Sequence, residues 1–452
     1  MICEVNIINK TFIKTILILA VIWSVFFFAF KKIPYLDVNV LFNDLMYQAK
    51  ALYFPSDTPT EDIVIVDIND KALWIIQRPD YLAKLIKTIS VKGGAKIIGV
   101  DILFDDLKHP DPPEKTFKDI PLDCSPERGK THEEMELACV IQSNEVSDVI
   151  LAVFSKKIAK GKHSFIYPVK ALMQATSGLG YVNNPMDKDG IHRRSYIWVD
   201  DKDTNKSVFT MPTVIAYSIT GSRPQVDSKN KDIINFNNNQ IHKLDKDSDQ
   251  FNILPELLGP SYKFKYITVK DIRDHRFDEK YLQNLFNDKI VFIGTTSLEQ
   301  QDLKRTPFTR FNQNDKLDGL MPGVEFHANT LLSLLHNKLY NYLPLWVDIL
   351  WAIVFVLLSV YFMLHTRLIL ATFLNVILVI VSFVIAFIIF LNYYLILQSL
   401  GSTIVTMLLA VPVCYTFRYL QEKRERHLVE TDKKHLMKLF DRYVSPDVAN
   451  LI

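Results

Sequence analysis

The hydropathy pattern is dominated by three long apolar runs near the carboxyl end. They cover residues 343–364, 368–391 and 395–417, and the second and third contain no charged residue. The first contains only Asp348, close to its start. Because a helix rises about 1.5 Å per residue, each run can cross a hydrocarbon core of about 30 Å. We predict three membrane spans here and a fourth, an anchor at 12–30.

Basic residues at the ends of these runs predict their orientation. The link between the first and second runs, residues 365–367, is short and basic, the link between the second and third runs carries no charge, and Arg418 opens a charged segment after the last run. Lys and Arg beside spans favour the cytoplasm. We therefore expect a multi-pass protein of the inner (plasma) membrane, with cytoplasmic ends at 1–11 and 418–452 and a large domain, 31–342, in the periplasm or outside. The segment 12–30 lacks the small-x-small pattern of a cleaved signal peptide.

Within the large domain, apolar runs of strand length alternate with segments of helical periodicity. Residues 62–68 and 96–102 are rich in β-branched side chains and flank 80–90, whose apolar residues recur at helical spacing. This order indicates a βαβ unit and a parallel sheet covered by helices. We also expect strands at 148–154 and 289–294, helices at 133–143, 211–219 and 322–335, and hairpins at 179–183 with 191–199 and at 227–249. The predicted fold class is an α/β extracytoplasmic domain with a mostly parallel sheet and β-hairpin additions, plus an α-helical membrane block.

Composition excludes some classes of function. A formal net charge of +2 over 452 residues gives no reason to expect nucleic acid as a partner. The 49% hydrophobic content fits a membrane protein that also carries a globular domain. Four cysteines are too few for a disulfide scaffold. Cys124 and Cys139 both lie in the large domain, where they either pair or remain free thiols.

A group of polar residues follows the predicted strands. Asp67 and Asp101 lie near the ends of two strands, and Thr295 and Thr296 follow a third. Ligands of open parallel sheets bind beyond the carboxyl ends of the strands. We therefore take these four residues as candidates for a ligand-binding crevice, whose carboxylates would suit a cation or a cationic ligand. The alternative is that both aspartates cap helices or turns.

Glu325, Arg193 and Arg194 are further candidates for ligand contacts. Glu325 lies on a predicted helix, where a packed or capping role is the alternative. Arg193 and Arg194 could hold an anionic ligand or partner, or form a solvated strand edge. The sequence contains no P-loop and no zinc or nucleophile signature. We assign no catalytic and no metal-binding residue, and an outer-face hydrolase using Asp67 and Asp101 is the least favoured function.

Six segments in order carry a resemblance to one family. They are DIVIVDIND at 62–70, GAKIIGVD at 94–101 with Leu103-Phe104, GLGYVN at 178–183, Asp189-Gly190 with Arg193-Arg194, KIVFIGTT at 289–296 and MPGVEFHAN at 321–329. With three spans directly after them, they resemble proteins that carry the second type of CHASE extracytoplasmic sensor domain, over residues 35–420. The resemblance implies a receptor whose outer domain, 31–342, binds a ligand that the sequence does not identify.

The segment FDRYVSPDV at 440–448 resembles the linker that precedes a class III adenylate cyclase domain in many members of that family. This implies a cytoplasmic output that makes cyclic AMP from ATP, uses Mg²⁺ and ATP as cofactors, and works as a homodimer. The metal-binding aspartates of such a domain have no counterpart in this sequence. The alternative is an extracytoplasmic binding or scaffolding membrane protein without enzymatic output. In both cases membrane lipid is an expected partner.

Overall fold

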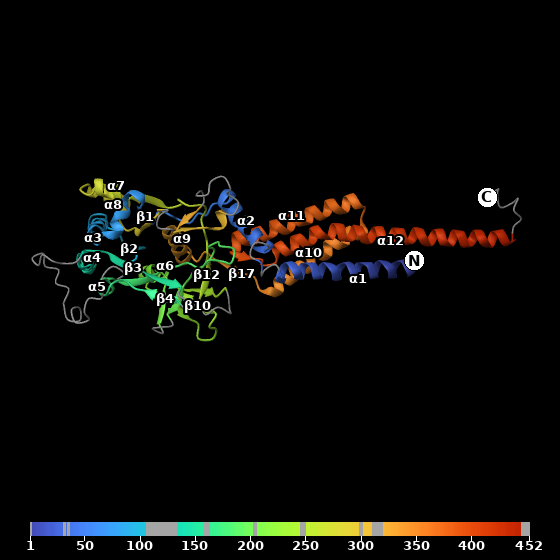
Figure 1. The fold of residues 1–452 in the computed structure, drawn as a ribbon, viewed down its shortest axis with the longest axis horizontal. Helices are drawn as coiled ribbons and strands as arrows, with labels where there is room; N and C mark the ends of the chain where they lie inside the picture. Colours follow the sequence, from blue (N-terminus) through green and yellow to red (C-terminus); the bar gives the residue numbers. More distant parts are fainter. Residues whose placement is uncertain are drawn as a thin grey trace, which may run out of the picture. The chain divides into compact units, whose positions relative to one another are not determined.

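The computed structural model describes residues 2–29, 33, 37–104, 133–157, 163–201, 206–244, 250–297, 302–309 and 320–443 (Figure 1). The chain forms two compact units. One is Asp44–Asn341, and the other combines Met1–Asn43 with Tyr342–Ile452. Each unit is described by itself below.

Seven strands of the unit Asp44–Asn341 form one sheet in the order β13-β1-β14-β2-β3-β4, with β5 also beside β3. All neighbours are parallel except β4, which runs antiparallel to β3. The strands are β1 (Ile63–Ile68), β2 (Ile97–Val100), β3 (Asp148–Lys157), β4 (His163–Ile166), β5 (Gly178–Tyr181), β13 (Lys265–Thr268) and β14 (Ile290–Thr295). The mostly parallel sheet expected from the sequence is therefore confirmed.

Helices cover both faces of this sheet, because successive residues of a strand point to opposite sides. Val64 and Val66 face one core, whereas Ile63 and Ile65 face the other. The first core contains residues of the 3₁₀ helix η4 (Asp70–Gln77) and of α3 (Pro79–Lys87), α4 (Glu133–Gln142), α5 (Lys170–Ala175), α7 (Val269–Asp274) and α8 (Glu279–Phe286). The second core contains residues of α6 (Met211–Thr220) and α9 (Gly323–Leu335).

One predicted hairpin is wrong. Residues 179–183 and 191–199 were expected to pair, but β5 lies parallel to β3, and β6 (Ser195–Tyr196) pairs with β12 (Asn252–Pro255). The physical reason is the packing of the glycines in β5 against α6. A Cβ at Gly180 would lie only 2.5 Å from the Met211 Cα, so this short strand fits beneath the helix.

The hairpin expected within 227–249 is present. Strand β10 (Ile233–Phe236) pairs antiparallel with β11 (Asn239–His242). The two residues between them, Asn237 and Asn238, have positive φ angles of 46° and 61°. Asparagine tolerates the left-handed region, which two-residue hairpin turns of this kind require at both positions.

The second unit is built from long apolar helices, namely α1 (Ile2–Ser24), α10 (Leu345–His365), α11 (Leu368–Tyr393) and α12 (Leu400–Tyr443). Among the described residues, four helices are long and apolar enough to cross a membrane, including Phe12–Ala29. The last begins at Leu400 and not at 395, because Tyr394 takes a left-handed conformation with φ of 53° and Leu395–Ile396 is extended.

Polar side chains join these helices to one another. Asn375 of α11 accepts a hydrogen bond from Ser359 of α10 at 2.6 Å and donates one to the Met407 carbonyl of α12 at 3.0 Å. Arg418 of α12 donates to the carbonyls of Met363 and Thr366, at 3.0 and 2.7 Å, and so caps the end of α10. Such bonds fix how helices pack in lipid, where apolar burial alone does not hold them together.

Candidate functional site

The carboxyl edge of the sheet has the geometry that α/β proteins use for ligands. Strand β14 lies between β1 and β2, with Asp67 opposite Gly294 and Ile293 opposite Val100. The chain leaves β1 into η4 on one face, whereas the next α-helix after β14, which is α9, lies on the other face. Strands whose following helices go to opposite faces leave a crevice at their carboxyl ends. Of the sequence-predicted residues, Asp67, Asp101, Thr295 and Thr296 lie at this edge of the sheet, which is called the crevice below.

The structure brings Asp67, Thr295 and Thr296 together. Thr296 Oγ1 donates to Asp67 Oδ1 at 2.7 Å, and Thr295 Oγ1 donates to the Ile68 carbonyl at 2.9 Å. Burial raises the pKa of the Asp67 carboxyl, although the hydrogen bonds from Thr296 act in the opposite direction. These bonds join the ends of β1 and β14, so Asp67 has a structural role here whether or not it also binds a ligand.

Asp101 lies on the other side of β14 and has different neighbours. Its Oδ2 is 3.8 Å from His327 Nε2 of α9. Burial and the nearby Asp302 carboxylate raise the pKa of Asp101 to about 8, against the influence of Lys304. Lys304 Nζ lies 2.7 Å from Asp302 Oδ1. Asp101 is therefore set to hold a proton near neutral pH, which weakens it as a cation ligand.

The two sequence-predicted aspartates do not share one site directly. One strand separates them, so their backbones are about 10 Å apart. Val324 of α9 packs onto Gly294 in the gap, and a Cβ at Gly294 would lie 2.8 Å from the Val324 Cβ. In the described part of the chain, no three His, Cys, Asp or Glu residues are arranged to hold a metal ion. A cation bound by both carboxylates stays a prediction that this geometry does not favour.

His327 belongs to this crevice but was not among the predicted site residues. It is 1% exposed, and its Nδ1 has no hydrogen-bond partner among the described residues. Burial, together with the Lys304 charge, lowers the pKa of His327 to about 3, so the ring is neutral at neutral pH. The sequence signal was weak, because helical spacing placed His327 on a different face from Glu325, and α9 proves to be buried almost all round.

Glu325 is fully buried on α9 and holds a neighbouring segment in place. Its carboxylate accepts hydrogen bonds from the backbone N–H groups of Tyr262 and Lys263 at 2.8 and 2.9 Å, and from the Tyr266 hydroxyl at 2.7 Å. Burial raises the pKa of Glu325, whereas these three bonds lower it. The geometry is that of an internal clamp, and its role as a ligand contact remains untested.

Arg193 lies in a buried cluster of charges. Its guanidinium forms two bonds to Asp44, at 2.7 and 2.8 Å, two to Asp189, at 2.6 and 3.0 Å, and one to Asp187 at 2.7 Å. Arg193 is 6% exposed, so the expectation of a solvated strand edge does not hold for it. Arg194 also bonds to Asp187, at 2.7 Å. An anionic ligand would have to compete with these internal carboxylates.

The predicted disulfide is only partly within the described residues. Cys139, on α4, is disulfide-bonded. Cys124 lies outside the described residues, so the pairing of Cys124 with Cys139 stays a prediction.

These features define the class of the protein. It has an α/β domain with a mostly parallel sheet, and candidate membrane spans flank that domain in the sequence. The model of the CHASE2 domain family matches residues 16–361, and the chain therefore belongs to this family. It is a membrane protein with a CHASE2 extracytoplasmic sensor domain. Searches of curated proteins and of solved structures found no match.

Proposed function

We propose that this chain is the receptor part of a signalling protein whose outer domain senses a ligand and controls a cytoplasmic adenylate cyclase-type output. The observation that carries the proposal is α12. It runs without a break from Leu400 to Tyr443, 44 residues. At about 1.5 Å per residue this is about 66 Å, roughly twice the thickness of a hydrocarbon core.

The composition of α12 divides it into two parts. The sequence is free of charge from Leu400 to Phe417 and strongly charged from Arg418 onward. The helix therefore continues from the apolar segment into the charged one, with Pro412 inside its apolar part. A rotation or displacement of its membrane part would reach position 440, where the resemblance to a cyclase linker begins. Basic residues after the span support a cytoplasmic location for this segment, as the proposal requires.

The outer domain offers a route by which a ligand could act on the spans. Lys50 of α2 (Val38–Tyr53) lies 2.5 Å from Glu256 and donates to the Tyr340 hydroxyl at 2.7 Å. Tyr340 lies on β17 (Leu339–Tyr342). In the sequence, α2 follows the first span and β17 precedes the second. The two segments that connect the domain to its spans are thus bonded to each other inside the domain.

Exposed apolar residues on α12 support a homodimer. Val429 and Leu436 are seven residues apart and are 66% and 54% exposed. Apolar side chains at heptad spacing are the pattern by which helices pair. A cysteine at Val429 should form disulfide-linked dimers in membranes, whereas a cysteine at Glu430, on a different face, should do so much less.

The function is tested in two steps, first by the mass of the protein and then by the product that it makes. The intact mass from native membranes should exceed 52.3 kDa by roughly 20 kDa, the size of one further domain. Those membranes should then make cyclic AMP from Mg²⁺ and ATP. Glu430→Pro, which breaks α12 at a cost of about 3 kcal/mol, should lower this synthesis, while Glu430→Ala should leave it unchanged. Membranes that contain the protein and make no cyclic AMP would contradict the cyclase output and favour a binding or scaffolding role.

A further inference from the structure

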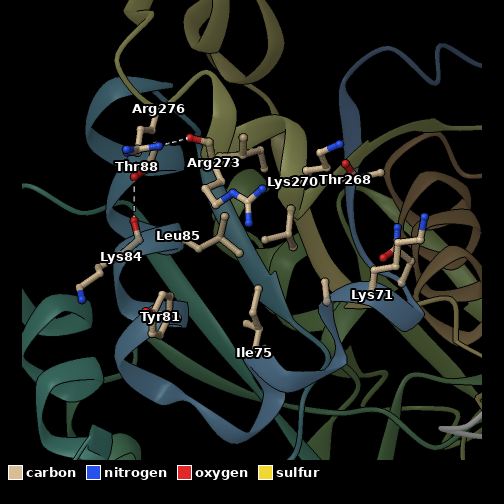
Figure 2. Close-up of a pocket in the computed structure, with 14 residues that line it drawn as sticks. Lys71, Ile75, Tyr81, Lys84, Leu85, Thr88, Thr268, Lys270, Arg273 and Arg276 are labelled. Carbon is tan, nitrogen blue, oxygen red and sulfur yellow. Dashed lines mark hydrogen bonds between the residues drawn. The ribbon is translucent and has the colours of Figure 1, made fainter.

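A groove in the outer domain opens at the carboxyl ends of two adjacent parallel strands. Asn69 directly follows β1, and Thr268 is the last residue of β13, whose residues pair in parallel with those of β1. From these points η4 and α7 run along the same face of the sheet, and α3 forms the opposite wall (Figure 2). The cavity between them measures about 640 Å³. This lies within the range of about 300–1,000 Å³ that small-molecule sites occupy.

The walls of this groove carry positive charge. Five cationic side chains line it, and no carboxylate does so among the described residues. They are Lys71, Lys84, Lys270, Arg273 and Arg276. The whole chain carries a formal net charge of only +2, so this is a local concentration of charge and not a general property of the surface. A cleft lined by one sign of charge attracts ligands of the opposite sign.

Four of these five cations have no carboxylate partner within the described residues, although Arg276 donates to the Arg273 carbonyl at 2.8 Å and stacks over the Phe277 ring at 4.5 Å, and Lys84 lies 5.1 Å from the Tyr81 ring. Lys71, Lys84 and Lys270 form no ion pair within the described part of the chain. Arg273 lies 3.1 Å from Asp274, but the two side chains are 58% and 48% exposed. An exposed pair of this kind contributes about 0–1 kcal/mol, so a ligand anion could replace it at little cost.

The floor of the groove is apolar. Ala72, Ile75, Leu85, Val269 and Ile272 line it, and all five belong to the core on this face of the sheet. In Figure 2 the Lys71 side chain lies toward one end of the groove and the Tyr81 ring toward the other, with Arg273 between them. The site thus combines an apolar surface, an aromatic ring and several separated cations.

We propose that this groove binds an organic anion with two or more carboxylate or phosphate groups on an apolar or ring-shaped body. The guanidinium groups of Arg273 and Arg276 suit the planar oxygen pairs of such acids. The lysines neutralise the remaining charge, and the body of the ligand covers the apolar floor. This proposal rests on the proposed sensor function, because it names the chemical class of ligand that the sensor would bind. The binding itself does not depend on any output.

The test is a titration of the full chain in nanodiscs of zwitterionic phosphatidylcholine, followed by calorimetry. The probes are benzene-1,3,5-tricarboxylate, citrate and the neutral benzene-1,3,5-tricarboxamide. We expect the tricarboxylate to bind more tightly than citrate, the tricarboxamide not to bind, and affinity to fall between about 0.05 and about 0.3 M salt. Arg273→Gln with Arg276→Gln should weaken binding at least about tenfold, equivalent to about 1.4 kcal/mol.

The matched control removes two positive charges elsewhere. Lys229 and Lys231 are exposed and lie away from the groove lining, so Lys229→Gln with Lys231→Gln should bind like the unchanged protein. The proposal is overturned if neither anion binds, if the tricarboxamide binds as well as the tricarboxylate, or if both double variants bind equally. A failed titration leaves the sensor function standing, whereas a missing cyclic AMP output with intact binding contradicts only the output.

Discussion

The charge cluster around Arg193 allows a quantitative prediction of stability. Replacing Arg193 by Met removes five hydrogen bonds and leaves Asp44 and Asp189, which are 0% and 8% exposed, without their cation. Removing one partner of a buried ion pair costs about 3–5 kcal/mol, mostly because a charge stays buried without compensation. For a domain of this size we expect the melting temperature to fall by about 6–10 °C.

The assay is thermal unfolding of the purified chain in detergent, followed by near-ultraviolet circular dichroism. Arg273→Met is the control, since that arginine is 58% exposed and paired at the surface, and should cost less than about 1 kcal/mol. Asp44→Asn combined with Arg193→Met should recover part of the loss, because one of the uncompensated carboxylates is then absent. If Arg193→Met melts like the control, the cluster does not stabilise the fold and the reasoning is refuted.

Two further predictions concern the crevice and the membrane helices. A carboxyl whose pKa is higher in the folded than in the unfolded chain binds more protons when the chain is folded. The pKa of Asp101 is about 8 in the folded chain, so the contribution of Asp101 to stability falls as the pH rises from about 4 to about 8. The pKa of His327 is about 3 in the folded chain, so its contribution to stability rises with pH, but only below about pH 6.5. Between pH 6.5 and 8 the melting temperature should therefore decrease, and Asp101→Asn should reduce this decrease. An equal decrease in the unchanged protein and in Asp101→Asn would contradict the prediction. In the membrane helices, Asn375→Leu removes the bonds to Ser359 and Met407 and should cost about 1 kcal/mol, measured as earlier unfolding on titration with a denaturing detergent.

The central strands could be predicted because they are buried on both faces. Residues 62–68 and 289–294 read as continuous β-branched runs, as strands of parallel sheets do. The region 265–286, in contrast, was not assigned, and it forms β13, α7 and α8. Strand β13 is short and lies at the sheet edge, where only Ile267 of its four residues is buried. Such a strand has no apolar run, so hydropathy alone does not reveal it.

Contacts between distant parts of the chain were beyond sequence reasoning. The crevice residues Asp67 and Thr296 were found because strand ends are visible locally and parallel strands bring them to one edge. The long-range partner of Arg193 was not found, because Asp44 is 149 residues away and nothing local links the two. The basic groove draws its cations from two separate segments, 71–88 and 268–276, and neither contains a recognisable motif.

Helix α2 connects these observations into one physical argument about signalling. It carries both Asp44, bonded to Arg193, and Lys50, bonded to Glu256 and Tyr340. These partners come from different parts of the domain, so α2 cannot turn or slide there without breaking buried ion pairs. A ligand can shift a receptor only by the difference between its affinities for two arrangements. Because breaking one such pair costs several kcal/mol, we expect α2 to move together with the domain as a rigid body. A bound ligand would then act by shifting the equilibrium between two arrangements of this rigid body.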